Sequence, residues 1–144
     1  AMIEAGISEG AKLLCGGPGR VPGFERGFYT RPTVFSEVDS AMRIAQEEIF
    51  GPVLCILAYD TIDEAVAIAN DTVYGLGAHV QAQDLELGRA VASRIRAGQV
   101  HLNHPAWDPM APFGGYKRSG NGREYGVIGF EEYLETKAII GFNA

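Results

Sequence analysis

Residues 53–71 read VLCILAYDTIDEAVAIAND, and this stretch decides the fold class. Residues 53–59 are almost all apolar, which is typical of a strand covered on both faces in a parallel sheet. Thr61 and Glu64 then form a T-x-x-E capping box, which predicts the start of a helix. The apolar residues of this helix share one face: Ile62, Ala65, Val66 and Ala69. A buried strand followed closely by an amphipathic helix is typical of a β-α-β unit.

The same pattern continues downstream. Residues 77–82 predict a second strand, and Asp84 can cap a helix that stops at Gly98. The apolar face of that helix comprises Leu87, Val91 and Ile95. Residues 99–103 predict a third strand. Strands and helices that alternate with short links form right-handed crossovers, so the sequence predicts an α/β fold with an open, mostly parallel sheet and flanking helices.

Shorter elements are expected on both sides of this core. Upstream, the pattern predicts a short helix at 2–9, a strand at 33–38 and a helical turn at 42–47. Downstream, it predicts a helix around 128–134 and a last strand at 136–142.

Composition limits the possible functions. The chain has 144 residues, 47% of them hydrophobic, which suits one globular domain. Its formal charge of −6 argues against nucleic acid and anionic membranes as partners. No apolar run reaches the roughly 18 residues of a membrane span, and the first residues show no signal-peptide pattern. Cys15 and Cys55 each lie in an apolar run, so we expect buried free thiols and a cytoplasmic protein.

The glycine-rich loop at 104–122 follows the third strand. Ligands in parallel sheets bind at the carboxyl ends of the strands, so this loop is a candidate for function. Trp107 and Phe113 could form the wall of an apolar channel, while the positive charges come from Lys117, Arg118 and Arg123. A surface loop with solvated charges is the alternative. The loop lacks the GxxxxGK[ST] spacing of a phosphate loop.

The histidines give no catalytic or metal signal. His79 and His101 fall inside predicted strands, where a hydrogen-bonded histidine is the usual finding. No pair has the spacing of a metal site, so we predict none, and no Gly-x-Ser-x-Gly elbow is present.

Residues 47–54, EEIFGPVL, place two carboxylates and a ring before a Gly-Pro break. Either this is an ordinary exposed corner, or Glu48 and Phe50 point at a ligand. Together with PFGGYKRSGNGRE at 112–124, the motif closely resembles the C-terminal part of the aldehyde dehydrogenase superfamily. The resemblance covers almost the whole chain, and the order and separation of the two motifs make it highly specific.

The resemblance implies a role for several residues. Glu48 would accept hydrogen bonds from the hydroxyls of the nicotinamide ribose, and Phe50 would pack near the nicotinamide. Phe113 would line the aldehyde channel, where Trp107 and Asp108 could touch the substrate. The other matching residues would be structural groups near the active site. Glu124 matches a carboxylate near the water network of the active site. Arg123 and Glu135 match residues of an ion-pairing network near subunit contacts.

The resemblance also implies what lies outside this chain. Residues 1–135 would belong to the catalytic domain and 136–144 would form an oligomerisation strand. The nucleophilic cysteine, the base and the cofactor loop of the family are expected upstream, because Cys15 and Cys55 match neither the nucleophile motif nor its surroundings. We therefore expect the parent enzyme to use NAD or NADP and to form a homo-oligomer. The chain alone should bind no cofactor and be inactive.

Two alternatives stay open. The chain could be a natural truncated interaction module that assembles with homologous subunits, because a sheet that lacks its first strands exposes an edge. It could also be a cofactor-binding remnant without chemistry, although a single ribose contact should bind very weakly.

Overall fold

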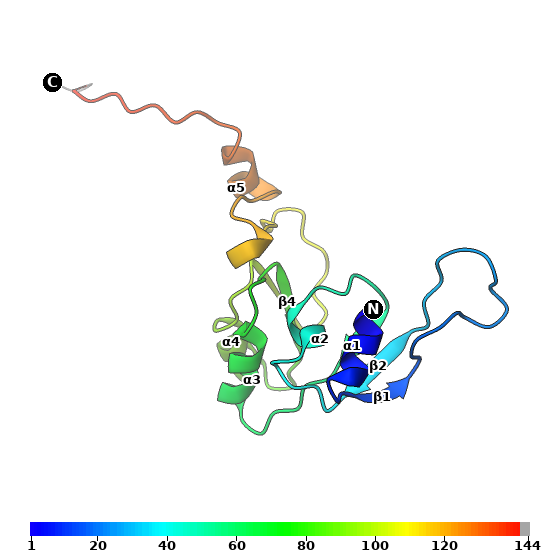
Figure 1. Cartoon of the computed structure of the whole chain (residues 1–144). Coiled ribbons are helices and arrows are strands. Elements are labelled where there is room, and N and C mark those ends of the chain that lie inside the picture. Colours follow the sequence, from blue (N-terminus) through cyan, green and yellow to red (C-terminus); the bar gives the residue numbers. More distant parts are fainter. Residues whose placement is uncertain (142–144) are drawn as a thin grey trace. The chain divides into compact units, whose positions relative to one another are not determined.

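The computed structural model describes residues 1–141, and the chain forms two compact units, Ala1–Thr72 and Val73–Ala144. Figure 1 shows their elements in the colours of the sequence. The predicted α/β class is confirmed. The strands, however, form two small sheets rather than one, since β3 and β4 are not hydrogen-bonded neighbours among the described residues.

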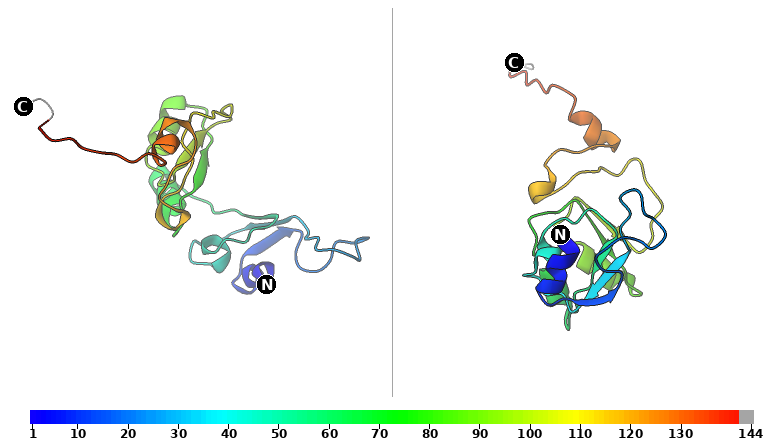
Figure 2. Two further views of the ribbon diagram at one scale, coloured as in Figure 1. Left: turned by 90° about the horizontal axis from the view of Figure 1, so that it is seen from above. Right: turned by 45° about the vertical axis from the view of Figure 1, so that its right-hand side comes forward.

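The first unit contains a three-stranded sheet and three helices: α1 (Met2–Ser8), β1 (Lys12–Cys15), β2 (Thr33–Ser36), α2 (Arg43–Gln46), β3 (Val53–Cys55) and α3 (Ile62–Asn70). The strand order is β1-β2-β3; β1 runs antiparallel to β2, and β2 runs parallel to β3. Helices α1 and α2 are in contact. The loop between β1 and β2 extends away from the sheet in every view (Figures 1 and 2).

Phe35 on β2 is the centre of the first core, with no exposed surface. Ala11, Val38 and Ile44 complete its buried cluster. Beside it, the buried Thr33 hydroxyl donates to the Arg31 carbonyl at 2.8 Å. Burial of apolar surface around this ring stabilises the unit.

The second unit is built on a parallel β-α-β motif: β4 (Gly77–Val80), α4 (Leu85–Ala92) and β5 (Gln99–Leu102). A short 3-10 helix η1 (Lys117–Ser119) and helix α5 (Gly126–Glu131) follow. Helix α4 packs on both strands, and Gly88 permits close approach because a Cβ there would lie 2.7 Å from Leu102 Cδ1.

Both predicted helix caps are present. The Thr61 hydroxyl accepts from the Glu64 N–H at 3.2 Å, and Asp84 Oδ1 accepts from the N–H groups of Glu86 and Leu87 at 2.9 and 3.2 Å. The capping box at Thr61 is shifted by one residue, because the Glu64 carboxylate accepts from the N–H of Asp60.

Several predicted boundaries are wrong. Strand β3 ends at Cys55 instead of residue 59, because parallel pairing with β2 ends there. Its Leu54 is 58% exposed, so this strand is not covered on both faces in this structure. Helix α4 ends at Ala92, well before Gly98. Residues 136–141 form no strand, and the rest of the predicted strand at 136–142 lies outside the described residues.

Two sequence expectations concern single side chains. Cys15 is exposed, so the prediction of two buried thiols is wrong for this residue; Cys55 is partly buried. His79 and His101 are partners in the β4–β5 register and stack with ring centroids 4.8 Å apart.

Within residues 1–141 no group of three or more His, Cys, Asp or Glu side chains could hold a metal ion. No described helix has the length and apolarity to span a membrane.

Candidate functional site

In the first unit, the candidate site residues lie at the corner between α2 and β3. The Arg43 guanidinium donates to both Glu47 oxygens, at 2.9 and 2.8 Å, across one helical turn. This contact lowers the pKa of the Glu47 carboxyl. Glu48 is exposed and takes no part in the pair. Of the two adjacent carboxylates, Glu47 therefore has a structural partner and Glu48 is the one available to a ligand.

Phe50 adopts the left-handed backbone conformation, with φ of 52°. That conformation is unfavourable for a residue with a side chain, and it turns the ring out so that 93% of Phe50 is exposed. The corner is then fixed at the start of β3, where the Pro52 carbonyl accepts from the Thr33 N–H at 2.8 Å. The ring borders a hollow of about 350 Å³ that Pro52 and the first residues of α1 also line.

In the second unit, the glycine-rich segment 112–124 forms a closed turn. The N–H of Phe113 donates to the Glu124 carbonyl at 2.8 Å, and the N–H of Glu124 donates to the Phe113 carbonyl at 2.7 Å. The ring of Phe113 lies 6.2 Å from that of Tyr125. The structure thus brings two of the predicted site residues together at the base of the turn.

This turn is anchored at the amino ends of β4 and β5, so the expectation that the loop lies at their carboxyl ends is wrong for this part of it. Gly75, just before β4, accepts through its carbonyl from the N–H groups of Gly98 and Tyr116, at 3.0 and 2.8 Å. Its own N–H donates to the Ser119 hydroxyl at 3.0 Å. The Gln99 amide donates to the Pro112 carbonyl at 3.1 Å. After β5 the chain therefore returns along the sheet before it makes the turn.

Gly98 is a residue whose role the sequence interpretation misses. A Cβ at this position would lie 1.5 Å from the Gly114 carbonyl oxygen, so the two backbones touch. The sequence pattern assigns Gly98 as a helix stop, although its actual neighbour is the glycine pair at 114–115. The glycines at 98 and 114–115 are the one feature of the sequence that could have indicated this contact, since close backbone contact requires residues without a side chain.

Arg123 binds the turn from inside. One guanidinium nitrogen, Nη1, donates to the carbonyls of Gly115, Asn121 and Gly122, at 3.0, 3.2 and 2.8 Å. The guanidinium also lies over the Tyr116 ring, 5.5 Å from its centre. Glu135 is exposed, and the described contacts of Arg123 include no ion pair with it.

A hollow of about 370 Å³ lies beside this turn. Phe113, Arg123 and Glu124 line it together with Glu132 and Tyr133. Trp107 and Asp108 are not among its lining residues: Trp107 is 77% exposed, and Asp108 accepts from the N–H of Met110 at 2.9 Å. The structure therefore groups Phe113, Arg123 and Glu124 but not the predicted substrate contacts at 107 and 108.

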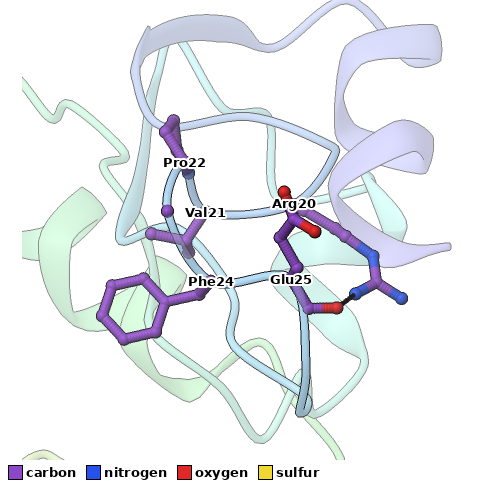
Figure 3. Close-up of a pocket in the computed structure, with 6 residues that line it drawn as sticks. Arg20, Val21, Pro22, Phe24 and Glu25 are labelled. Atoms are coloured by element: carbon purple, nitrogen blue, oxygen red, sulfur yellow. Dashed lines mark hydrogen bonds between the residues drawn. The ribbon is translucent and has the colours of Figure 1, made fainter.

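A third hollow, of about 430 Å³, lies within the long β1–β2 loop and contains no predicted site residue. Figure 3 shows its lining, with Arg20 donating to the Glu25 carbonyl and the Phe24 ring turned away from that contact. The Arg20 guanidinium is therefore already hydrogen-bonded to the backbone of the loop that lines this hollow.

Neither thiol has the surroundings of a catalytic nucleophile. Burial raises the pKa of the Cys55 thiol, which donates to the Ile44 carbonyl at 3.4 Å. Cys15 is exposed at the end of β1. No histidine lies at hydrogen-bond distance from either sulfur among the described contacts.

The chain belongs to the aldehyde dehydrogenase family, because the family model described as "Aldehyde dehydrogenase family" matches residues 1–139. The resemblance drawn from its two motifs is therefore confirmed.

Individual relatives make the similarity more specific. A 3-succinoylsemialdehyde-pyridine dehydrogenase of a Pseudomonas species is 57% identical over 97% of this chain. A crystal structure of a cysteine-to-alanine mutant of Aldehyde Dehydrogenase C from Pseudomonas syringae, in complex with NAD+ and octanal, is 87% identical over 98% of the chain with a TM-score of 0.95. An aldehyde dehydrogenase of Mycobacterium tuberculosis, in complex with NAD+, is 50% identical over 99% of the chain with a TM-score of 0.90. The chain spans 29–30% of the length of these relatives.

Proposed function

We propose that this chain is part of an enzyme that oxidises a straight-chain aliphatic aldehyde to the carboxylic acid with NAD+. The observation that carries the proposal is the 87% identity, over 98% of the chain, to a protein whose crystal structure contains NAD+ and octanal. The catalytic thiol and base would come from residues outside this chain, because the chain spans 29% of that protein and its own two cysteines lack a nucleophile's surroundings.

The corner before β3 fits the nicotinamide half of the cofactor. Glu48 is an exposed carboxylate next to a paired one, so it can accept from two ribose hydroxyls. Phe50 offers an exposed flat ring that suits the face of a nicotinamide. When bound, NAD+ supplies the hydride acceptor; the part of these residues is to hold and orient it.

The closed turn of the second unit fits the aldehyde side. The Phe113 ring gives an apolar surface for an alkyl chain, and Glu124 is held next to it by two backbone hydrogen bonds. Residues 136–144 would act as an oligomerisation strand that pairs only in an assembled homo-oligomer, and 1–135 would belong to the catalytic domain. We place the enzyme in the cytoplasm, where its free thiols would stay reduced.

The test is NADH formation by the complete polypeptide that carries this chain, with octanal and NAD+. We expect turnover with NAD+, much slower turnover with NADP+, and none from the 144-residue chain alone. Absence of NADH formation from every straight-chain aldehyde offered to the folded complete polypeptide would overturn the proposal.

A further inference from the structure

We infer that Arg123 is a positioning residue of the aldehyde channel: it holds the turn at 114–122 closed and thereby fixes the ring of Phe113. The inference rests on the proposed function, because Phe113 meets a substrate only if an aldehyde enters beside this turn. It adds to that function a residue that sets the preference of the enzyme for long-chain over short-chain aldehydes.

The side chain of Arg123 is hydrogen-bonded to both limbs of the turn. Its guanidinium is committed to three backbone carbonyls from the two limbs of the turn: Gly115 on the outgoing limb, and Asn121 and Gly122 on the return. Hydrogen bonds from a charged donor are stronger than those between neutral groups. A single side chain therefore links limbs that consist largely of glycine.

The glycines of the turn leave the space that this guanidinium occupies. A Cβ at Gly114 would lie 2.2 Å from the Gly122 carbonyl oxygen and 3.0 Å from Arg123 Nη1. The guanidinium thus fills the inside of the turn, and the Tyr116 ring covers it from one side. Without Arg123 the inside of the turn would lose both its filling group and its donor, and glycine-rich backbone has many other conformations available.

The turn is connected to Phe113 through the residue that follows Arg123. Arg123 immediately precedes Glu124, whose N–H and carbonyl both pair with Phe113. Beyond the turn, Tyr125 places its ring against Phe113. At the far side the turn is fixed to Gly75 through the Tyr116 N–H and the Ser119 hydroxyl. The orientation of the Phe113 ring therefore depends on a closed turn with Arg123 at its centre.

The consequence depends on the length of the aldehyde. A long alkyl chain gains free energy from contact with a fixed apolar wall, whereas a two-carbon aldehyde is too short to use it. A loosened Phe113 should therefore weaken the reaction of octanal and leave that of acetaldehyde nearly unchanged.

The experiment compares four variants of the complete polypeptide: Arg123→Ala, Arg123→Lys, Phe113→Ala, and Arg123→Ala with Phe113→Ala. Arg118→Ala is the matched control, because Arg118 lies in the same turn and its side chain takes no part in these contacts. kcat/KM is measured with octanal and with acetaldehyde. Hydrogen exchange of the amides at 114–122 is measured in the same proteins, and it reports the state of the turn without activity.

Arg123→Ala should lower kcat/KM for octanal by about tenfold and that for acetaldehyde by less than about twofold, with faster amide exchange at 114–122. Arg123→Lys should recover part of the loss, and the double variant should be no worse than Phe113→Ala. Equal losses for both aldehydes, an additive double variant, or unchanged exchange in Arg123→Ala would overturn the inference. If Arg123→Ala does not fold, the same comparisons are made with Arg123→Lys. A wild-type protein inactive on all aldehydes would instead refute the proposed function, and the exchange measurement would still test the closed turn.

Discussion

Phe113 and Glu124 exchange both of their backbone hydrogen bonds, at 2.8 and 2.7 Å, across a turn that is rich in glycine and has few apolar side chains. Such a turn has little core of its own. Its shape comes from this pair at its base, from Arg123 inside it and from the contact of its backbone with Gly98. The site residues of the second unit are thus held by backbone contacts at least as much as by side chains.

We predict that Gly98→Ala destabilises the second unit. The added Cβ would lie 1.5 Å from the Gly114 carbonyl oxygen, so the backbone of the turn must move. Overpacking of this kind costs about 1–3 kcal/mol, and we expect the upper half of that range in denaturant unfolding of the chain. Gly77→Ala is the control, because a Cβ there meets nothing within 4 Å. Equal stability of the two variants would contradict the close contact.

Helix α4 offers a second prediction, at its first turn. Asp84→Ala removes an acceptor for two backbone N–H groups. Loss of an N-cap lowers the free energy of unfolding by about 1 kcal/mol, so the second unit should unfold at a lower denaturant concentration. Asp84→Asn keeps an acceptor at the cap and should lose much less. If Asp84→Ala and Asp84→Asn unfold at the same denaturant concentration, the side chain of Asp84 does not stabilise α4 as a cap.

The sequence predicted the features that depend on local chemistry. Thr61 and Asp84 start helices because their side chains satisfy N–H groups within the next three residues, and this needs no distant partner. The two motifs identified the family because their residues and spacing are specific. Glu48 and Phe50 were also located together at one corner from the sequence alone, and whether they bind NAD+ stays a prediction.

Features that depend on distant pairing could not be predicted in the same way. The apolar run at 53–59 does not show where β3 ends, because the strand ends where its pairing with β2 stops, at Cys55 opposite Phe35. The glycine at 98 resembles a helix stop in the sequence, although its contact is with Gly114, far along the chain. The resemblance matches Arg123 with an ion pair, yet its described acceptors are neutral carbonyls in its own turn.

The two thiols should differ in reactivity. Burial raises the pKa of the Cys55 thiol, so less of it is the reactive thiolate than for an ordinary exposed thiol at the same pH. We expect iodoacetamide to modify Cys55 at least about tenfold more slowly than the exposed Cys15 in the folded chain, as measured by mass spectrometry of Cys15→Ser and Cys55→Ser. The raised pKa also implies that the contribution of Cys55 to stability is constant below about pH 9 and falls as the pH rises through its folded-state pKa. If Cys55 is modified as fast as Cys15 or faster, its thiol is more accessible to solvent than the structure places it.

The last prediction concerns the neighbouring carboxylates at 47 and 48, which should have different effects on cofactor use in the complete polypeptide. Glu48→Gln removes the charge from an exposed acceptor that we propose binds the ribose hydroxyls. Hydrogen bonds to a charged group contribute about 1.5–3 kcal/mol, so KM for NAD+ should rise by about tenfold or more. Glu47→Gln is the matched control: Glu47 is bound to Arg43, and its loss should alter KM for NAD+ by less than about twofold. The measurement is the initial rate of NADH formation against NAD+ concentration at saturating octanal. A KM that changes equally in both variants would mean that the corner acts only through its fold, and a change confined to Glu47→Gln would move the ribose contact to that residue.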